Sequence, residues 1–176
     1  MKADCRRVAR PQGGGLVLTE NDVVKAVAAH LAENGYRIDK ALTTIERGID
    51  IVAESRSTGD RLLVEAKGGT SSKSSTARFG EPFTLNQARS HVSVALYCAA
   101  KLYHRHSSEN VTVALALPDD SVHRGLVNDI ASALDVLGIG VFFVGADSRV
   151  TERPAVRRQV AAQPGSPPDA PQAARR

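Results

Sequence analysis

Two neighbouring segments, residues 48–54 and 61–67, constrain the fold most. Each is mainly apolar, and its charged residues lie an even number of positions apart, so that they share one side of an alternating pattern. Successive side chains of a β-strand point to opposite faces, so this alternation is typical of strands. The turn-forming residues 56–59 lie between the segments and predict a hairpin. One face is then expected to carry Asp50, Val52, Glu54, Leu63, Glu65 and Lys67, and the other Ile49, Ile51, Ala53, Leu62, Val64 and Ala66.

The register of this hairpin places two acidic residues opposite each other. A symmetric loop over residues 56–59 pairs 55 with 60 and 54 with 61, and the same register sets Asp50 against Glu65. The Cβ atoms of such a pair lie roughly 4.5–5.5 Å apart, where two carboxylates repel. A cation, a proton or the neighbouring Lys67 must compensate. We interpret the pair as a divalent-metal site.

The chemistry of Mg²⁺ fits this interpretation. Mg²⁺ binds one or two carboxylates, keeps several waters and shares its remaining positions with phosphate oxygens, and Mn²⁺ is a plausible substitute. Lys67 points the same way as Glu65 and is expected to hold an attacking water and to offset charge that develops on a phosphate. The three residues therefore favour hydrolysis of a phosphodiester.

The rest of the central region reads as alternating helices and strands. Thr19 and Thr84 are good N-caps for helices with apolar residues at helical spacing. The predicted order is α-β-β-β-α-β-α-β, an α/β fold with a central mixed sheet flanked by helices. The predicted elements are a helix at 20–34, strands at 36–44, 48–54 and 61–67, a long helix after Thr84, a strand at 111–117, a helix at 121–137 and a strand at 139–144.

The run Gly48-Ile49-Asp50-Ile51, followed by Leu63-Val64-Glu65-Ala66-Lys67 between a leading and a following helix, resembles the PD-(D/E)xK nuclease superfamily. The resemblance covers residues 20–117 in element order. It implies a restriction-endonuclease-like α-β-β-β-α-β core, here with an added α-β, and a Mg²⁺-dependent endonuclease. One departure is Ile49 in place of the proline that gives the motif its first letter, a replacement that many members share.

The resemblance also implies two further site residues. Members often take a glutamate from the first helix as a metal ligand, and Glu20 is the candidate here. Asp22 is equally close, and either carboxylate also favours the positive helix N-terminus. Members also use a polar residue from the helix after the lysine strand, a place that Gln87 fits. The alternative for Gln87 is an exposed helical glutamine.

Net charge alone says little about nucleic-acid binding. The chain carries +4, but residues 1–15 carry +3 and residues 153–176 carry +4, which leaves −3 for residues 16–152. Residues 67–105 hold Glu81 as their only acid, and within them Lys73, Arg78 and Arg89 are candidates for phosphate contacts. A solvated basic helix face explains these charges equally well. DNA is favoured over RNA as the partner.

Composition predicts one nuclease-like domain at 16–150. The basic segment 1–15 and the segment 151–176, rich in Pro, Ala and Arg, are expected to be disordered tails. Two distant cysteines and the lack of a membrane-length apolar run favour a cytoplasmic protein with no membrane partner. A homodimer, or a partner protein that supplies targeting, is left open.

Two other interpretations remain. The first is a non-catalytic module that binds nucleic acid or protein on the same fold. The second treats Glu65 and Lys67 as a surface charge pair beside an edge residue, Asp50, and predicts no affinity for metal. Neither interpretation needs two clustered carboxylates, which is why the nuclease is preferred.

Overall fold

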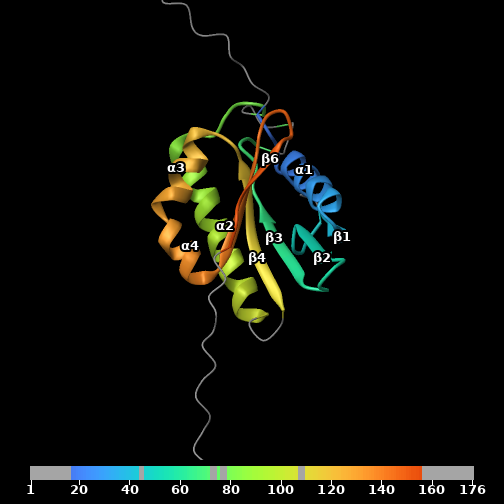
Figure 1. The fold of residues 1–176 in the computed structure, drawn as a ribbon. Coiled ribbons are helices and arrows are strands. Elements are labelled where there is room, and N and C mark those ends of the chain that lie inside the picture. Colours follow the sequence, from blue (N-terminus) through green and yellow to red (C-terminus); the bar gives the residue numbers. More distant parts are fainter. Residues whose placement is uncertain (1–16, 44–45, 72–74, 76–78, 107–109, 156–176) are drawn as a thin grey trace, which may run out of the picture.

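The computed structural model describes residues 17–43, 46–71, 75, 79–106 and 110–155, and they form a six-stranded mixed sheet between layers of helices (Figure 1). Its elements are α1 (Glu20–Glu33), β1 (Tyr36–Ala41), β2 (Ile51–Ser55), β3 (Arg61–Ala66), α2 (Leu85–Arg105), β4 (Val111–Pro118), α3 (Ser121–Asp129), α4 (Ala131–Leu137), β5 (Ile139–Val144) and β6 (Val150–Arg153).

The strands lie in the sheet in the order in which they occur in the chain. β1, β2 and β3 form an antiparallel meander, with a register shift between Ile38 and Lys40 on β1. β3, β4 and β5 are parallel, and β6 returns antiparallel to β5. The long helix α2 provides the crossover between β3 and β4, as parallel pairing requires. The α/β class and the mixed sheet are confirmed.

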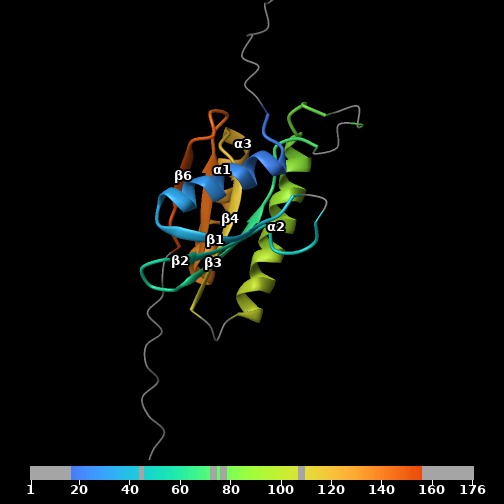
Figure 2. The ribbon, with the colours of Figure 1, turned by 90° about the vertical axis from the view of Figure 1, so that its right-hand side faces the viewer.

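Each face of the sheet has its own core. α1 covers one face, while α2, α3 and α4 cover the other, as Figures 1 and 2 show. On the α1 side, Val23, Val27 and Leu31 pack against residues of β2 to β5 that include Ile51 and Val64. On the α2 side, the helices pack against Val52, Leu63, Leu115, Val141 and Phe143. Because β3, β4 and β5 are buried on both faces, they are nearly continuous apolar runs.

The hairpin has the predicted register. Ile51 pairs with Val64, Val52 with Leu63, Ala53 with Leu62 and Glu54 with Arg61. The predicted strand at 48–54 was wrong at its start, because β2 begins at Ile51. Ile49 was also placed on the wrong face, since it packs against the core on the α2 side. Strict alternation does not extend beyond the end of a strand, and Gly48 has a φ of 154° that redirects the chain there.

Two further predictions about elements need correction. The helix expected at 121–137 is two helices, because Ile130 leaves helical geometry, with φ −114° and ψ 12°, and ends α3. Leu126 and Leu134 on either side of the break still face the same core, so apolar spacing does not reveal it. The strand β6 was not predicted, and residues 151–153, which were assigned to the tail, belong to it. The predicted disorder of the tails concerns residues that lie outside those described, apart from 151–155.

None of the helices among the described residues is both long and apolar enough to cross a membrane.

Candidate active site

The candidate site lies at the end of the β2–β3 hairpin that is farther from its turn. Asp50 directly precedes β2, and its Oδ2 accepts a hydrogen bond of 2.7 Å from the backbone N–H of Ala66. The Asp50 carboxylate therefore takes the place of a backbone carbonyl at the end of the ladder. This bond fixes the carboxylate beside Glu65 and Lys67, the two charged residues that flank Ala66.

Lys67 lies at the centre of the charged cluster. Its Nζ donates to Oε1 of Glu65 at 2.8 Å and to the carbonyl of Ala66 at 2.6 Å, and it lies 3.5 Å from Oε2 of Glu20. The side chains of Lys67 and Glu65 are only 13% and 12% exposed. A charge pair this buried is unlike an ordinary surface pair, because both partners have lost most of their water.

Glu20 reaches the site because α1 approaches the end of β3 very closely. A Cβ on Gly68 would lie 2.7 Å from the carbonyl carbon of Thr19 and would also overlap the backbone nitrogen of Glu20. Gly68 therefore allows the first turn of α1 to pack directly against the residue after Lys67. Asp22, the other candidate on α1, is engaged with Thr19 in the capping box of the helix, whereas Glu20 lies beside Lys67.

The electrostatics of the cluster are those of partly buried, opposed charges. Burial raises the pKa of Asp50 above its ordinary value and the charge of Glu65 raises it further, against the Ala66 hydrogen bond and Lys67. Burial alone would lower the pKa of Lys67, but its bond to Glu65 and the charges of Glu65, Glu20 and Asp50 raise it. Lys67 is thus firmly protonated, and Asp50 is a carboxylate that gains from a nearby cation.

One flank of α2 closes the site on the side away from α1. The Cys98 thiol lies near Glu65, and burial together with the charge of Glu65 raises its pKa. His91, seven residues earlier on the same flank, stacks on Phe83 with a centroid separation of 4.4 Å. Burial and the nearby Lys67 lower the pKa of His91, which favours its neutral form. Sequence reasoning gave Cys98 no role; its i+7 spacing from His91 was the available signal.

The hydrogen bonds of Gln87 and Arg89 that the structure describes are to neighbours within the first turns of α2. Gln87 serves the capping box of α2, where its Oε1 accepts from the N–H of Thr84 at 2.9 Å and from the hydroxyl of Thr84 at 3.0 Å. Arg89 is exposed beside Asn86 and lies about two and a half helical turns before Cys98, on the opposite flank. Lys73 and Arg78 lie outside the described residues.

The donor set is compatible with a divalent cation. The described part of the chain contains no group of three or more Asp, Glu, His or Cys side chains arranged to hold a metal. Mg²⁺ needs fewer protein ligands than that, since it keeps several waters. Asp50 and Glu65 offer two oxygen ligands, and a cation between them would relieve the raised pKa of Asp50. Lys67 now provides the positive charge that faces Glu65.

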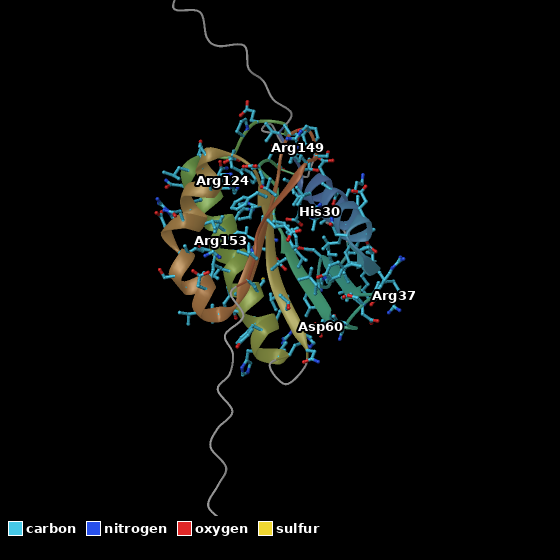
Figure 3. All side chains as sticks on the ribbon, in the orientation of Figure 1. His30, Arg37, Asp60, Arg124, Arg149 and Arg153 are labelled. Atoms are coloured by element: carbon cyan, nitrogen blue, oxygen red, sulfur yellow. The ribbon has the colours of Figure 1, made fainter. Side chains whose placement is uncertain are left out.

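A pocket of about 300 Å³ lies next to the site, beyond the carboxyl ends of the parallel strands. Gly69, Phe83 and His123 are among the residues that line it. His123 is 2% exposed, and its Nδ1 lies 2.7 Å from Oδ2 of Asp120, the N-cap of α3. Figure 3 shows that Arg124 of α3 and Arg153 of β6 lie on the side of α3 and α4, whereas His30 lies on the side of α1.

Comparison of the chain with models of protein families, with curated proteins and with solved structures gave no match, so the assignment of a function rests on the geometry described above.

Proposed function

We propose that this protein is a metal-dependent nuclease that hydrolyses phosphodiester bonds of nucleic acid, with DNA as the expected substrate. The observation that carries the proposal is the position of Asp50 beside the Glu65–Lys67 pair. The Asp50 carboxylate accepts from the N–H of Ala66, the residue between Glu65 and Lys67, just beyond the paired part of the hairpin. Two half-buried carboxylates and a lysine within one cluster match the needs of phosphoryl-transfer chemistry.

In this proposal Asp50 and Glu65 hold a Mg²⁺ or Mn²⁺ ion, with Glu20 as an additional ligand at the edge of the cluster. The ion supplies Lewis-acid polarisation of a phosphate oxygen and lowers the pKa of a bound water. Lys67 holds the attacking water and offsets negative charge on the phosphorus-bound oxygens in the transition state. The backbone N–H of Ala66 keeps the carboxylate of Asp50 oriented throughout.

We propose a more specific fold as well, on the basis of the order of the elements. The order α1-β1-β2-β3-α2-β4 supports the resemblance to the PD-(D/E)xK superfamily, as does the placement of Asp50 just before β2, Glu65 on β3 and Lys67 just after it. The proposed core is therefore restriction-endonuclease-like, with α3, α4, β5 and β6 added. Gln87 has no catalytic role in this proposal, because its side-chain oxygen caps α2.

The first test is cleavage of labelled single-stranded, duplex and branched DNA and RNA with Mg²⁺ or Mn²⁺. We expect the parent protein to cut at least one substrate only when metal is present, and Asp50→Asn and Lys67→Ala to lose at least about 100-fold in rate, because each removes a group that acts in the transition state. Asp39→Asn, which alters an exposed carboxylate of β1 that pairs with Arg37, is the matched control and should cut like the parent.

Thermal unfolding with added metal separates the proposal from the charge-pair interpretation. Mg²⁺ should raise the melting temperature of the parent but not of Asp50→Asn, because only the native parent binds the ion. If the protein shows neither cleavage nor stabilisation by metal, the result would support the interpretation of Glu65 and Lys67 as a charge pair that binds no metal. Nucleic-acid binding without cleavage under every metal condition would instead support the non-catalytic module.

A further inference from the structure

The flank of α2 beside the candidate active site continues outward as a surface without acidic residues. α2 contains Arg89, Lys101 and Arg105 and has no Asp or Glu along its whole length. By contrast α1, on the other face of the sheet, contains three acidic residues and one lysine. Of these two helices, α2 is therefore the one whose charged side chains are all basic.

A continuous series of contacts leads from the site onto this surface. Cys98 lies near Glu65, and Lys101 follows it on α2 by about one helical turn, so the charges of both residues act on the thiol. The Nζ of Lys101 lies 5.5 Å from the centroid of the Tyr97 ring. Val94, four residues before Cys98, lies on the same flank. The series thus runs from a proposed metal ligand to an aromatic ring on the surface.

Tyr97 and Val94 are exposed to an extent that their own packing does not explain. Tyr97 is 65% exposed and Val94 53% exposed, although both occur in the central turns of a well-formed helix. An aromatic ring beside a lysine is the combination with which proteins bind single strands, because the ring stacks on a base and the ammonium binds the backbone phosphate. In a duplex the base faces are already stacked on each other and cannot meet the ring.

We propose that Val94, Tyr97 and Lys101 form a binding surface for a single-stranded segment of the nucleic acid, with one base stacked on Tyr97 and a phosphate bound by Lys101. The proposal rests on the proposed function for the position of the cleaved bond, which lies at the Glu65 end of this surface. The substrate class is then a single strand, or a duplex with an unpaired end or flap.

The test is the affinity of the full-length protein for a labelled single-stranded oligonucleotide, measured by fluorescence anisotropy with EDTA so that no cleavage occurs. Tyr97→Leu should weaken binding about 5-fold to 100-fold, the range for loss of one stacked base. Tyr97→Phe should restore it, because stacking needs the ring and not the hydroxyl. Lys101→Ala should weaken binding and reduce the slope of log affinity against log salt by about 0.7.

Two matched variants control for general effects. Tyr103→Leu removes a tyrosine that is 44% exposed on another flank of α2, and Lys25→Ala removes an exposed lysine from α1. Both should bind the single strand like the parent. Binding of a blunt duplex should change little in Tyr97→Leu, because the duplex offers Tyr97 no free base face.

The outcomes for this surface and for the nuclease can be told apart. Metal-dependent cleavage together with unchanged binding by Tyr97→Leu and Lys101→Ala would overturn the surface and leave the nuclease intact. Weaker binding by both variants in a protein that never cleaves would support the surface and refute the nuclease. Failure of the full chain to bind any single strand, or equal losses in Tyr97→Leu and Tyr103→Leu, would also overturn the surface.

Discussion

At the scale of single residues, Gly68 determines whether the site can form. Glu20 is the first residue of α1 and lies 48 positions before Gly68 in the chain. At Gly68 the backbone packs directly against the backbone of Thr19 and Glu20. The 3.5 Å approach of Glu20 to Lys67 therefore depends on the missing side chain of the residue that follows Lys67. The sequence shows a glycine there, but only the structure shows what the glycine makes room for.

Replacement of Gly68 by alanine should destabilise the protein. The new Cβ would meet backbone atoms of Thr19 and Glu20, which cannot rotate away, so α1 must shift, at a cost of about 1–3 kcal/mol. Gly125→Ala is the control, because a Cβ at this position of α3 meets no atom within 4 Å. It should stabilise the protein by up to about 1 kcal/mol through helix propensity. Urea unfolding measures both, and equal midpoints for the two variants would contradict the prediction.

At the scale of elements, the hairpin and the capped helices were predictable, whereas the packing between them was not. Period-two alternation and the turn at 56–59 predicted the register of the β2–β3 hairpin, and Thr19 and Thr84 marked the starts of α1 and α2. The approach of Cys98 to Glu65 depends on how α2 rotates over the sheet. The use of Gln87 as a cap, by contrast, follows from the local pattern of Thr84 and a glutamine three residues later. Rotation follows from packing over many residues, and no local pattern encodes it.

The N-cap of α3 should make the stability of the protein sensitive to acid. Burial alone would raise the pKa of Asp120, but hydrogen bonds from the side chain and N–H of His123, together with that of Val122, lower it overall. A carboxylate with a lower pKa in the folded state stabilises the fold above the unfolded value of about 3.9, and this contribution is lost as pH falls through the folded value.

Asp120→Ala should therefore lose about 1–2 kcal/mol of stability at neutral pH. Its difference from the parent should shrink as the pH falls from the unfolded value of about 3.9 through the lower folded value. Urea titrations of the parent and Asp120→Ala, at neutral pH and at acidic pH, measure how the difference in their free energies of unfolding changes. Asp129→Asn, which alters an exposed carboxylate at the end of the same helix, should stay within about 0.5 kcal/mol of the parent. A deficit for Asp120→Ala that is constant with pH would show that the charge of Asp120 contributes nothing.

At the scale of the whole molecule, a single sheet contributes side chains to the hydrophobic cores on both of its faces. Residues of β3 alternate between the α1 side and the α2 side, as Val64 and Leu63 illustrate, so neither side can lose its packing without disturbing the other. The sequence predicted this arrangement of layers through the apolar runs at 111–117 and 139–144. The strand β6 could not be predicted in the same way. It is short, with two exposed residues between two partly buried ones, and so has little apolar periodicity.

We therefore expect the protein to unfold in a single cooperative transition. Leu31→Ala on the α1 side and Leu134→Ala on the α2 side each open a cavity in a fully packed core and should cost about 2–5 kcal/mol. Calorimetry should show one peak for each variant, with equal calorimetric and van't Hoff enthalpies. Two separate peaks in either variant would mean that the two sides unfold independently.

The order of the strands also governs how the chain behaves while it leaves the ribosome. Because every strand pairs with its neighbour in sequence, β1, β2 and β3 can assemble as soon as residue 66 has emerged. β3 then presents an unpaired edge rich in leucine and valine until β4, beginning at Val111, is synthesised. Translation of α2 thus coincides with the period in which nascent chains are most exposed to aggregation with one another.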